Sequence, residues 1–240
     1  MFFVGREKEI SLIIKALKRG DNVILAGKYG IGRTSLIKYV ADTTRNRWRF
    51  IFVDFSKTPG KVCGLLIDEL LPKGKGKTRG EILGYKSNRF RISNLDFADR
   101  RQHVLVLDNI AKLSAQKLDL IRYLAMAKRF RFVAIVENFM REDDLFVLRA
   151  RLSNALLINI PHLGMEAARE YFRHFSGQHH FHWSESQVNH LAEMTGGYPV
   201  GMKEVVTRKL ARSQSTKDDV ILAKPKGPRV GGSLRRPDTL

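Results

Sequence analysis

Short apolar runs alternate along the first two thirds of the chain with segments in which apolar residues recur every three or four positions. The spacing of three or four positions is typical of helices, and it occurs in residues 7–19 and 115–128. The apolar runs are rich in β-branched residues and apolar on both faces, which predicts a parallel sheet covered on both sides. The five predicted strands are residues 22–26, 50–55, 103–109, 131–138 and 155–160.

The pattern changes at Pro161, after which no further strand is predicted. Three helical segments follow, at residues 165–175, 185–195 and 199–210. Beyond Arg212 the chain is rich in Pro, Gly and basic residues and has almost no apolar periodicity, which is typical of disorder. The expected domains are therefore an α/β domain, a small helical domain and a disordered basic tail, at residues 1–160, 161–212 and 213–240.

The segment "GKYGIGRT" joins the first predicted strand to a predicted helix. It fits the phosphate-loop pattern G-x-x-x-x-G-K-[ST] at Gly27, Gly32 and Thr34. In such a loop the backbone N–H groups and the helix N-terminus attract phosphate, and the hydroxyl of Thr34 would bind Mg²⁺. A glycine turn without a ligand is the alternative. The residues expected to bind ATP here are Gly27, Lys28, Tyr29, Gly30, Ile31, Gly32, Arg33, Thr34 and Ser35.

Arg33 departs from the pattern, because it stands where a lysine is required. Arginine is a planar fork that can bind phosphate, yet it is less suited than lysine to stabilising the transferred group. Lys28, at the second position of the loop, is a partial substitute. The sequence therefore favours nucleotide binding over fast hydrolysis.

Asp108 ends the run "VLVLD" in the third predicted strand, where an acid can hold Mg²⁺ at the carboxyl edge of the sheet. The next residue is Asn109, at a position where many ATPases carry a glutamate that activates the attacking water. An amide can orient a water molecule but cannot take its proton. This second change again points to slow hydrolysis.

With these residues and "FVGREKEI" (residues 3–10), the chain resembles the AAA+ ATPases over roughly residues 2–210. The resemblance is to the branch that joins initiator-type (origin-recognition/Cdc-like) proteins with STAND signalling ATPases. It implies a parallel-sheet P-loop NTPase domain of α/β class followed by a helical lid. It also implies that Val4, Gly5 and Arg6 lie over the adenine of ATP, and that Pro199 in "GGYP" packs near it.

The resemblance extends to residues that would sense ATP or act between subunits of a homo-oligomer. Asn138 matches the polar sensor of the γ-phosphate, at the end of the fourth predicted strand. Arg149 or Arg151 stands where an arginine finger would reach the nucleotide of a neighbouring subunit. An ordinary exposed arginine on a helix is the alternative for each.

Charge is the strongest feature of the composition. The 240 residues include 43 Lys and Arg against 24 Asp and Glu, a formal net charge of +19, which favours a polyanionic partner such as DNA over a merely solvated basic surface. On a flexible loop, Lys and Arg would bind phosphates without reading the base sequence. Phe90 and Phe97 could stack on bases, but core packing is the favoured interpretation. The expected DNA contacts lie between the second and third strands: Lys73, Lys75, Lys77, Arg79, Lys86, Arg89 and Arg91.

Other sites are disfavoured. A single cysteine, Cys63, excludes an internal disulfide framework and fits a reducing compartment. The histidines at 179, 180 and 182 lack the partners of a zinc site, so a solvated turn is expected. No signal peptide or membrane-spanning run is predicted, which indicates a cytoplasmic protein without a membrane partner.

These features together predict an ATP- and Mg²⁺-binding protein that assembles with nucleotide and binds DNA non-specifically. An accessory ATPase for transposition, recombination or replication of a mobile element, with a transposase or recombinase as protein partner, fits the length and charge by family analogy. Two alternatives stay open. One is a non-hydrolysing nucleotide-sensing scaffold, and the other is a STAND-type signalling switch with protein partners.

Overall fold

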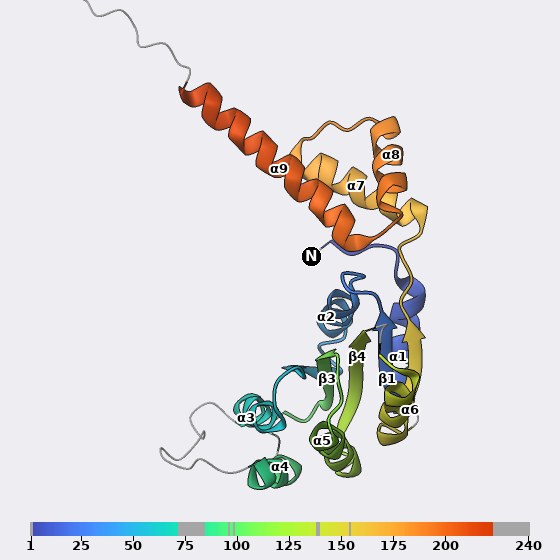
Figure 1. Ribbon diagram of the computed structural model, residues 1–240, viewed down its shortest axis with the longest axis vertical. Coiled ribbons are helices and arrows are strands. Elements are labelled where there is room, and N and C mark those ends of the chain that lie inside the picture. Colours follow the sequence, from blue (N-terminus) through green and yellow to red (C-terminus); the bar gives the residue numbers. More distant parts are fainter. Residues whose placement is uncertain are drawn as a thin grey trace, which may run out of the picture. The chain divides into compact units, whose positions relative to one another are not determined.

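The computed structural model describes residues 2–71, 85–95, 97, 99–137, 140–153 and 155–222, with side chains up to residue 213. The chain divides into two compact units, Met1–Met202 and Lys203–Leu240. The first unit begins with α/β structure, shown in Figure 1. Its elements are α1 (Glu7–Arg19), β1 (Asn22–Gly27), α2 (Arg33–Thr43), β2 (Trp48–Asp54), α3 (Pro59–Leu70), α4 (Tyr85–Asn94), β3 (Gln102–Ile110), α5 (Ala115–Met126), β4 (Phe130–Glu137), α6 (Glu142–Arg151) and β5 (Ala155–Asn159).

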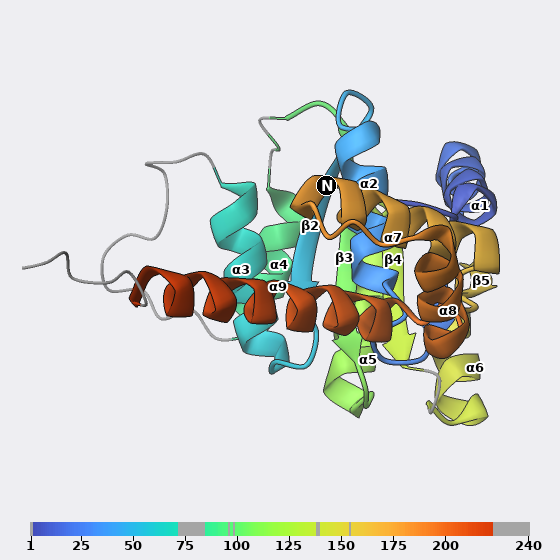
Figure 2. The same ribbon diagram turned by 90° about the horizontal axis from the view of Figure 1, so that it is seen from above.

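The five strands form one parallel sheet in the order β2-β3-β4-β1-β5, which confirms the predicted strands and their direction. Two hydrophobic clusters cover its faces. Buried residues of α3, α4, α5 and α6 pack on one face, and those of α1 and α2 pack on the other. Figure 2 shows α1 and the pair α3 and α4 at opposite ends of the sheet. The central strands β1, β3 and β4 are buried along most of their length, which explains their uninterrupted apolar runs in the sequence.

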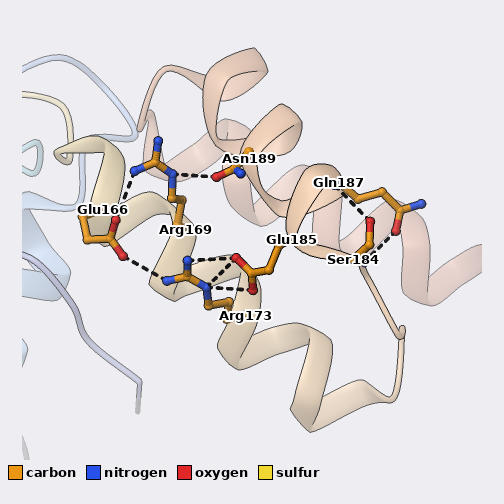
Figure 3. Close-up of polar contacts among 7 residues, drawn as sticks. All are labelled: Glu166, Arg169, Arg173, Ser184, Glu185, Gln187 and Asn189. Carbon is orange, nitrogen blue, oxygen red and sulfur yellow. Dashed lines mark hydrogen bonds and ion pairs between the residues drawn. The ribbon is translucent and has the colours of Figure 1, made fainter.

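The helices after β5 are α7 (Met165–His179), α8 (Glu185–Thr195) and α9 (Pro199–Leu222), as the spacing predicts. Polar side chains join α7 and α8, as Figure 3 shows. Arg173 forms an ion pair with Glu185 at 2.9 Å, and Arg169 donates to Asn189 at 2.8 Å. Ser184 caps α8 in a capping box with Gln187, which fixes where the helix begins.

Two segments differ from the sequence expectation. Helix α9 continues to Leu222, past the predicted start of the tail at residue 213. Residues 85–94, expected within a basic loop, form helix α4, because Ile92 is fully buried in the core beside α3. Among the described residues, no helix is both long and apolar enough to cross a membrane.

Candidate nucleotide site

The N-terminal segment ties the phosphate loop to the start of the helical region. Arg6 is buried, and its guanidinium donates to the carbonyl oxygen of Pro161 at 2.7 Å and of Ile31 at 3.4 Å. Burial lowers the pKa of Arg6, and nearby Glu9 opposes that effect. Gly5 has φ +70°, and a Cβ there would lie 2.4 Å from Cβ of Ala167. Arg6 thus contacts the loop directly, while a position of Val4, Gly5 and Arg6 over the adenine stays a prediction.

The loop itself has the backbone of an anion-binding turn. Gly30 and Gly32 have φ values of +75° and +93°, a conformation that favours glycine. Gly32 is the N-cap of α2, and no side chain caps that helix. The first-turn N–H groups of a helix have no intrahelical partner, so they are available to phosphate oxygens together with the positive end of the helix dipole.

Thr34 and Asp108 meet across the carboxyl edge of the sheet. Thr34 Oγ1 lies 3.0 Å from Asp108 Oδ2 and 3.2 Å from Asp108 Oδ1. The sequence places these residues 74 positions apart, and the parallel order of β1, β4 and β3 brings them together. A hydroxyl and a carboxylate side by side are oxygen ligands of the kind that Mg²⁺ prefers. Thr34 and Asp108 therefore lie together, and their role as a Mg²⁺ site stays a prediction.

Arg33 takes a different direction. Its guanidinium donates to the carbonyl oxygen of Val136 and to a carboxylate oxygen of Glu137, the last residue of β4. Both side chains are largely buried, at 7% exposure for Arg33 and 15% for Glu137. Gly27 and Glu137 are register partners at the ends of β1 and β4. The ion pair therefore connects the end of β4 to the residues that follow the loop. Arg33 is therefore engaged with protein groups rather than directed to a phosphate.

A cavity of about 440 Å³ adjoins this ion pair. Its lining includes Gly27, Lys28, Glu137, Asn159 and His162. Lys28 is exposed, which leaves its ammonium able to reach a ligand above the loop. The second carboxylate oxygen of Glu137 is buried, and in the described part of the chain it has no hydrogen-bond partner.

Asn109 adopts an unusual backbone conformation beside Asp108. Its φ is +59°, and the ladder between β3 and β4 is irregular between Leu107 and Ile110. The Asn109 side chain donates to Oδ1 of Asp54 at 3.3 Å. Asp54 also accepts from the hydroxyl of Ser56, and this hydrogen bond is the main cause of a lowered pKa at Asp54.

The "GGYP" segment lies at the phosphate loop. Tyr198 donates its hydroxyl to the carbonyl oxygen of Tyr29, and a Cβ on Gly30 would lie 2.8 Å from Val200. Pro199 follows Tyr198 as the first residue of α9. Gly197 has φ +67°, and a Cβ there would lie 2.1 Å from the Leu163 carbonyl oxygen, so only glycine fits.

The arginine-finger candidates lie away from this chain's own loop. Arg149 and Arg151 are exposed in the last turn of α6, just before β5. Ala155 at the start of β5 is the register partner of Asn22, at the opposite end of β1 from the loop. Any role in catalysis would thus concern another copy of the chain. Asn138 lies outside the described residues.

The expected DNA contacts fall into two groups. Lys73, Lys75, Lys77 and Arg79 lie outside the described residues. Lys86, Arg89 and Arg91 are on helix α4 and not on a flexible loop, which corrects that expectation. Arg89 forms an ion pair with Asp119 and lies over the Tyr123 ring, so its charge is used within the fold.

The two candidate stacking aromatics also separate. Phe97 packs on the core, with Arg129 over its ring, as the favoured interpretation has it. Phe90 is 62% exposed, so the prediction that it packs in the core is wrong.

Cys63 is buried within α3, and burial raises the pKa of its thiol to about 11. Across the part of the chain that the structure describes, no group of three or more His, Cys, Asp or Glu residues is arranged to hold a metal ion.

Comparison with solved structures identifies the architecture. The Aeropyrum pernix ORC1 protein in complex with DNA matches 81% of this chain at 15% identity and TM-score 0.54. Cdc6p from Pyrobaculum aerophilum matches 88% at 13% identity and TM-score 0.60. The Thermotoga maritima RuvB Holliday junction branch migration motor matches 90% at 17% identity and TM-score 0.57. The fold is that of the AAA+ ATPases.

The likeness is one of structure, since the identities are low. No family model matches the chain, and no curated protein matches it in sequence. The chain spans 61% of the ORC1 structure, 62% of the Cdc6p structure and 65% of the RuvB structure. The five-stranded sheet in the order β2-β3-β4-β1-β5, followed by helices, is the feature that they share with it.

Three residues at the site were not singled out from the sequence. The carboxylates of Glu137 and Asp54 accept hydrogen bonds from the side chains of Arg33 and Asn109. The hydroxyl of Tyr198 donates to a carbonyl oxygen of the loop. A signal existed for the first two, because Asp54 and Glu137 each lie one residue before the end of a predicted strand, as Asp108 does. Acids at the carboxyl ends of parallel strands gather at one edge of a sheet.

Proposed function

We propose that this chain binds Mg²⁺·ATP at the phosphate loop and works as a nucleotide-controlled module on DNA. The observation that carries this proposal is the contact of Thr34 with Asp108 at the uncapped N-terminus of α2. Thr34 and Asp108 would hold Mg²⁺, which neutralises phosphate charge when bound. Backbone N–H groups of the loop and the Lys28 ammonium would bind the phosphate oxygens.

Hydrolysis in this proposal is slow. Arg33 is held by Glu137, so its guanidinium is not in the place in which lysine stabilises the transferred phosphoryl group, and Lys28 is only a partial substitute. Asn109 can orient a water molecule without accepting its proton. ATP would therefore act mainly as a switch, in which contacts to the nucleotide favour one arrangement of loop and "GGYP" segment.

The DNA part of the proposal rests on charge and on structural analogy. A net charge of +19 favours non-specific phosphate binding, and one of the similar structures is of a protein in complex with DNA. The side chains of Lys86 and Arg91 on α4 are the cations that we propose for contacts with DNA phosphates. An accessory role for a transposase or recombinase, with assembly of several copies, is the form of this function that we propose.

The Arg33–Glu137 ion pair favours one rival, a nucleotide-sensing scaffold that binds ATP and never hydrolyses it. ATP turnover by the purified chain, with and without duplex DNA, separates the two, with Asp108→Ala as the blank. Turnover absent from the blank and stimulated by DNA supports the proposed function. ATP binding without turnover supports the scaffold, and no binding of ATP would overturn both.

Arg33→Lys adds a second comparison. Lysine would lose one of the two contacts made by the guanidinium, and its flexible stem could turn toward the nucleotide. We expect turnover to rise by about tenfold, on the order of 1.4 kcal/mol in barrier height. Unchanged turnover in a stably folded Arg33→Lys variant would indicate that the loop cation is not what limits the rate.

A further inference from the structure

Asp54 lies at the carboxyl edge of the sheet, next to the proposed Mg²⁺ ligand Asp108. It is the last residue of β2 and the register partner of Asp108 on β3. Asn109 follows Asp108 and donates its side-chain N–H to Oδ1 of Asp54 at 3.3 Å. The contact therefore connects an edge strand of the sheet to the residue beside the proposed metal ligand.

The backbone of Asn109 is held in place from several directions. Its φ of +59° lies in the left-handed region, which asparagine tolerates better than most residues. Its backbone N–H donates to Oδ1 of Asp108 at 2.9 Å. Uncommon backbone conformations that the surroundings fix in this way concentrate at functional sites.

Several hydrogen bonds also hold the carboxylate of Asp54 in place. Its Oδ1 accepts from the Ser56 hydroxyl at 2.6 Å and from the Ser56 backbone N–H at 3.1 Å. The carbonyl oxygen of Asp108 accepts from the backbone N–H of Phe55 at 2.7 Å, which keeps the ends of the two strands together. Asp54 therefore presents an acceptor oxygen to Asn109 in one fixed place.

This contact sets the orientation of the Asn109 amide. An ionised carboxylate only accepts hydrogen bonds, so the NH₂ end of the amide must face Asp54 and the oxygen must face away. Asn109 is exposed, and among the described residues its side-chain oxygen has no partner. A fixed acceptor thus stands beside Asp108 at the carboxyl edge of the sheet.

We infer that Asp54 is a positioning residue, which holds the Asn109 amide so that its oxygen orients the water that attacks ATP. The inference rests on the proposed function. In the step, the water oxygen bonds to the γ-phosphorus while the bond to the β–γ bridging oxygen breaks. That electron pair leaves with ADP. Because an amide takes no proton, both protons of the water stay with the released phosphate, which is consistent with slow turnover.

The test is steady-state ATP turnover by the full chain with Mg²⁺·ATP, together with binding of a fluorescent ATP analogue and the melting temperature. Asp54→Ala removes the acceptor, and we expect kcat to fall about 10²-fold with KM unchanged within about threefold, since misplacement of a reacting group costs about that much. Asp54→Asn keeps an acceptor oxygen and should recover most of the loss.

A double variant gives a sharper readout. Asn109→Ala removes the amide itself, so kcat should fall about as far as in Asp54→Ala, and Asp54→Ala added to Asn109→Ala should lower kcat no further, because the two residues act through one contact. A kcat for Asp54→Ala equal to wild type overturns the inference. So does a loss of kcat that only follows a loss of folded protein, because a purely structural contact would give that result.

The remaining outcomes separate this inference from the proposed function. If the wild-type chain binds Mg²⁺·ATP and shows no turnover, the positioning role is overturned and nucleotide binding stands. If the wild-type chain binds no nucleotide, both are overturned. Loss of KM rather than kcat in Asp54→Ala also contradicts the inference, because it would place Asp54 in substrate binding.

Discussion

Arg33 and Thr34 are neighbours at the start of α2, yet the structure uses them on opposite sides of the loop. Arg33 is buried beside β4, where Glu137 and the Val136 carbonyl accept its N–H groups. Thr34 lies toward β3, where its hydroxyl contacts Asp108. The β4 side therefore has the character of a structural ion pair, and the β3 side keeps the arrangement of a metal site.

The difference shows what a changed motif residue can mean. Lysine at position 33 would be a compact point charge, whereas arginine presents a planar fork that satisfies two acceptors at once. Two acceptors at the end of β4 suit that fork. Arg33 therefore serves the fold, and the backbone of the loop and the hydroxyl of Thr34 are the groups that we propose for ligand binding.

Glu137→Gln should have the largest effect on the β4 side. The change leaves the buried Arg33 guanidinium without an anionic partner, which costs about 3 kcal/mol of unfolding free energy. For a chain of this size we expect the melting temperature to fall by roughly 6–12 °C. Thermal unfolding followed by circular dichroism measures it, and a fall of a degree or less would contradict the buried ion pair.

Thr34→Ala tests the β3 side. Loss of the hydroxyl removes one proposed Mg²⁺ ligand, so Mg²⁺-dependent turnover should fall about 10²-fold, equivalent to about 2.7 kcal/mol in barrier height. Thr34→Ser is the matched control, because it keeps the hydroxyl and should stay within about threefold of wild type. Equal losses in both variants would show that packing of the threonine methyl group matters and its hydroxyl does not.

Lys28→Ala tests whether Lys28, rather than Arg33, is the side-chain cation that binds the phosphates of ATP. Lys28 is exposed and lines the cavity beside the loop, whereas Arg33 is engaged elsewhere. We expect ATP affinity to fall about tenfold, or about 1.4 kcal/mol, with no change in melting temperature. An affinity equal to wild type would mean that loop N–H groups alone bind the phosphates.

Glu185→Gln should have the smallest effect, and it is the exposed counterpart of Glu137→Gln. Hydrogen bonds from Arg173 lower the pKa of Glu185 below its ordinary value of 4.5. Any stabilisation is thus present above pH 4.5 and lost as the pH falls through the lower folded-state value. Because solvent and salt screen this pair, we expect a melting-temperature change of at most about 2 °C, absent in 0.5 M salt. A change as large as that of Glu137→Gln would contradict the contrast between buried and exposed pairs.

The sequence predicted the parts of the fold that depend on hydrophobic period and glycine placement. Helix α1 has the predicted bounds, and the five strands agree with prediction to within a few residues. The central strands β1, β3 and β4 were the clearest, because burial on both faces leaves uninterrupted apolar runs. Asp108 was identified for the same reason, since it ends such a run. Gly27, Gly32 and Thr34 were enough to identify the segment as a candidate phosphate loop.

The partners of the site residues could not be predicted in the same way. Which acid Arg33 meets depends on the order of strands, and β4 rather than β3 pairs with β1. Helix α4 was missed because its sequence is strongly polar, with Ile92 as its only fully buried residue. The end of α9 was misplaced because a change in composition does not by itself end a helix.

The most direct test of the account is the affinity for ATP, with and without Mg²⁺, of a variant in which both members of the β4 ion pair are replaced, Arg33→Met with Glu137→Met. Replacing both avoids an unpaired buried charge, so the fold should survive. The account predicts an affinity within about threefold of wild type and an intact Mg²⁺ dependence. A folded double variant that no longer binds ATP would contradict it, because Arg33 would then be a phosphate ligand.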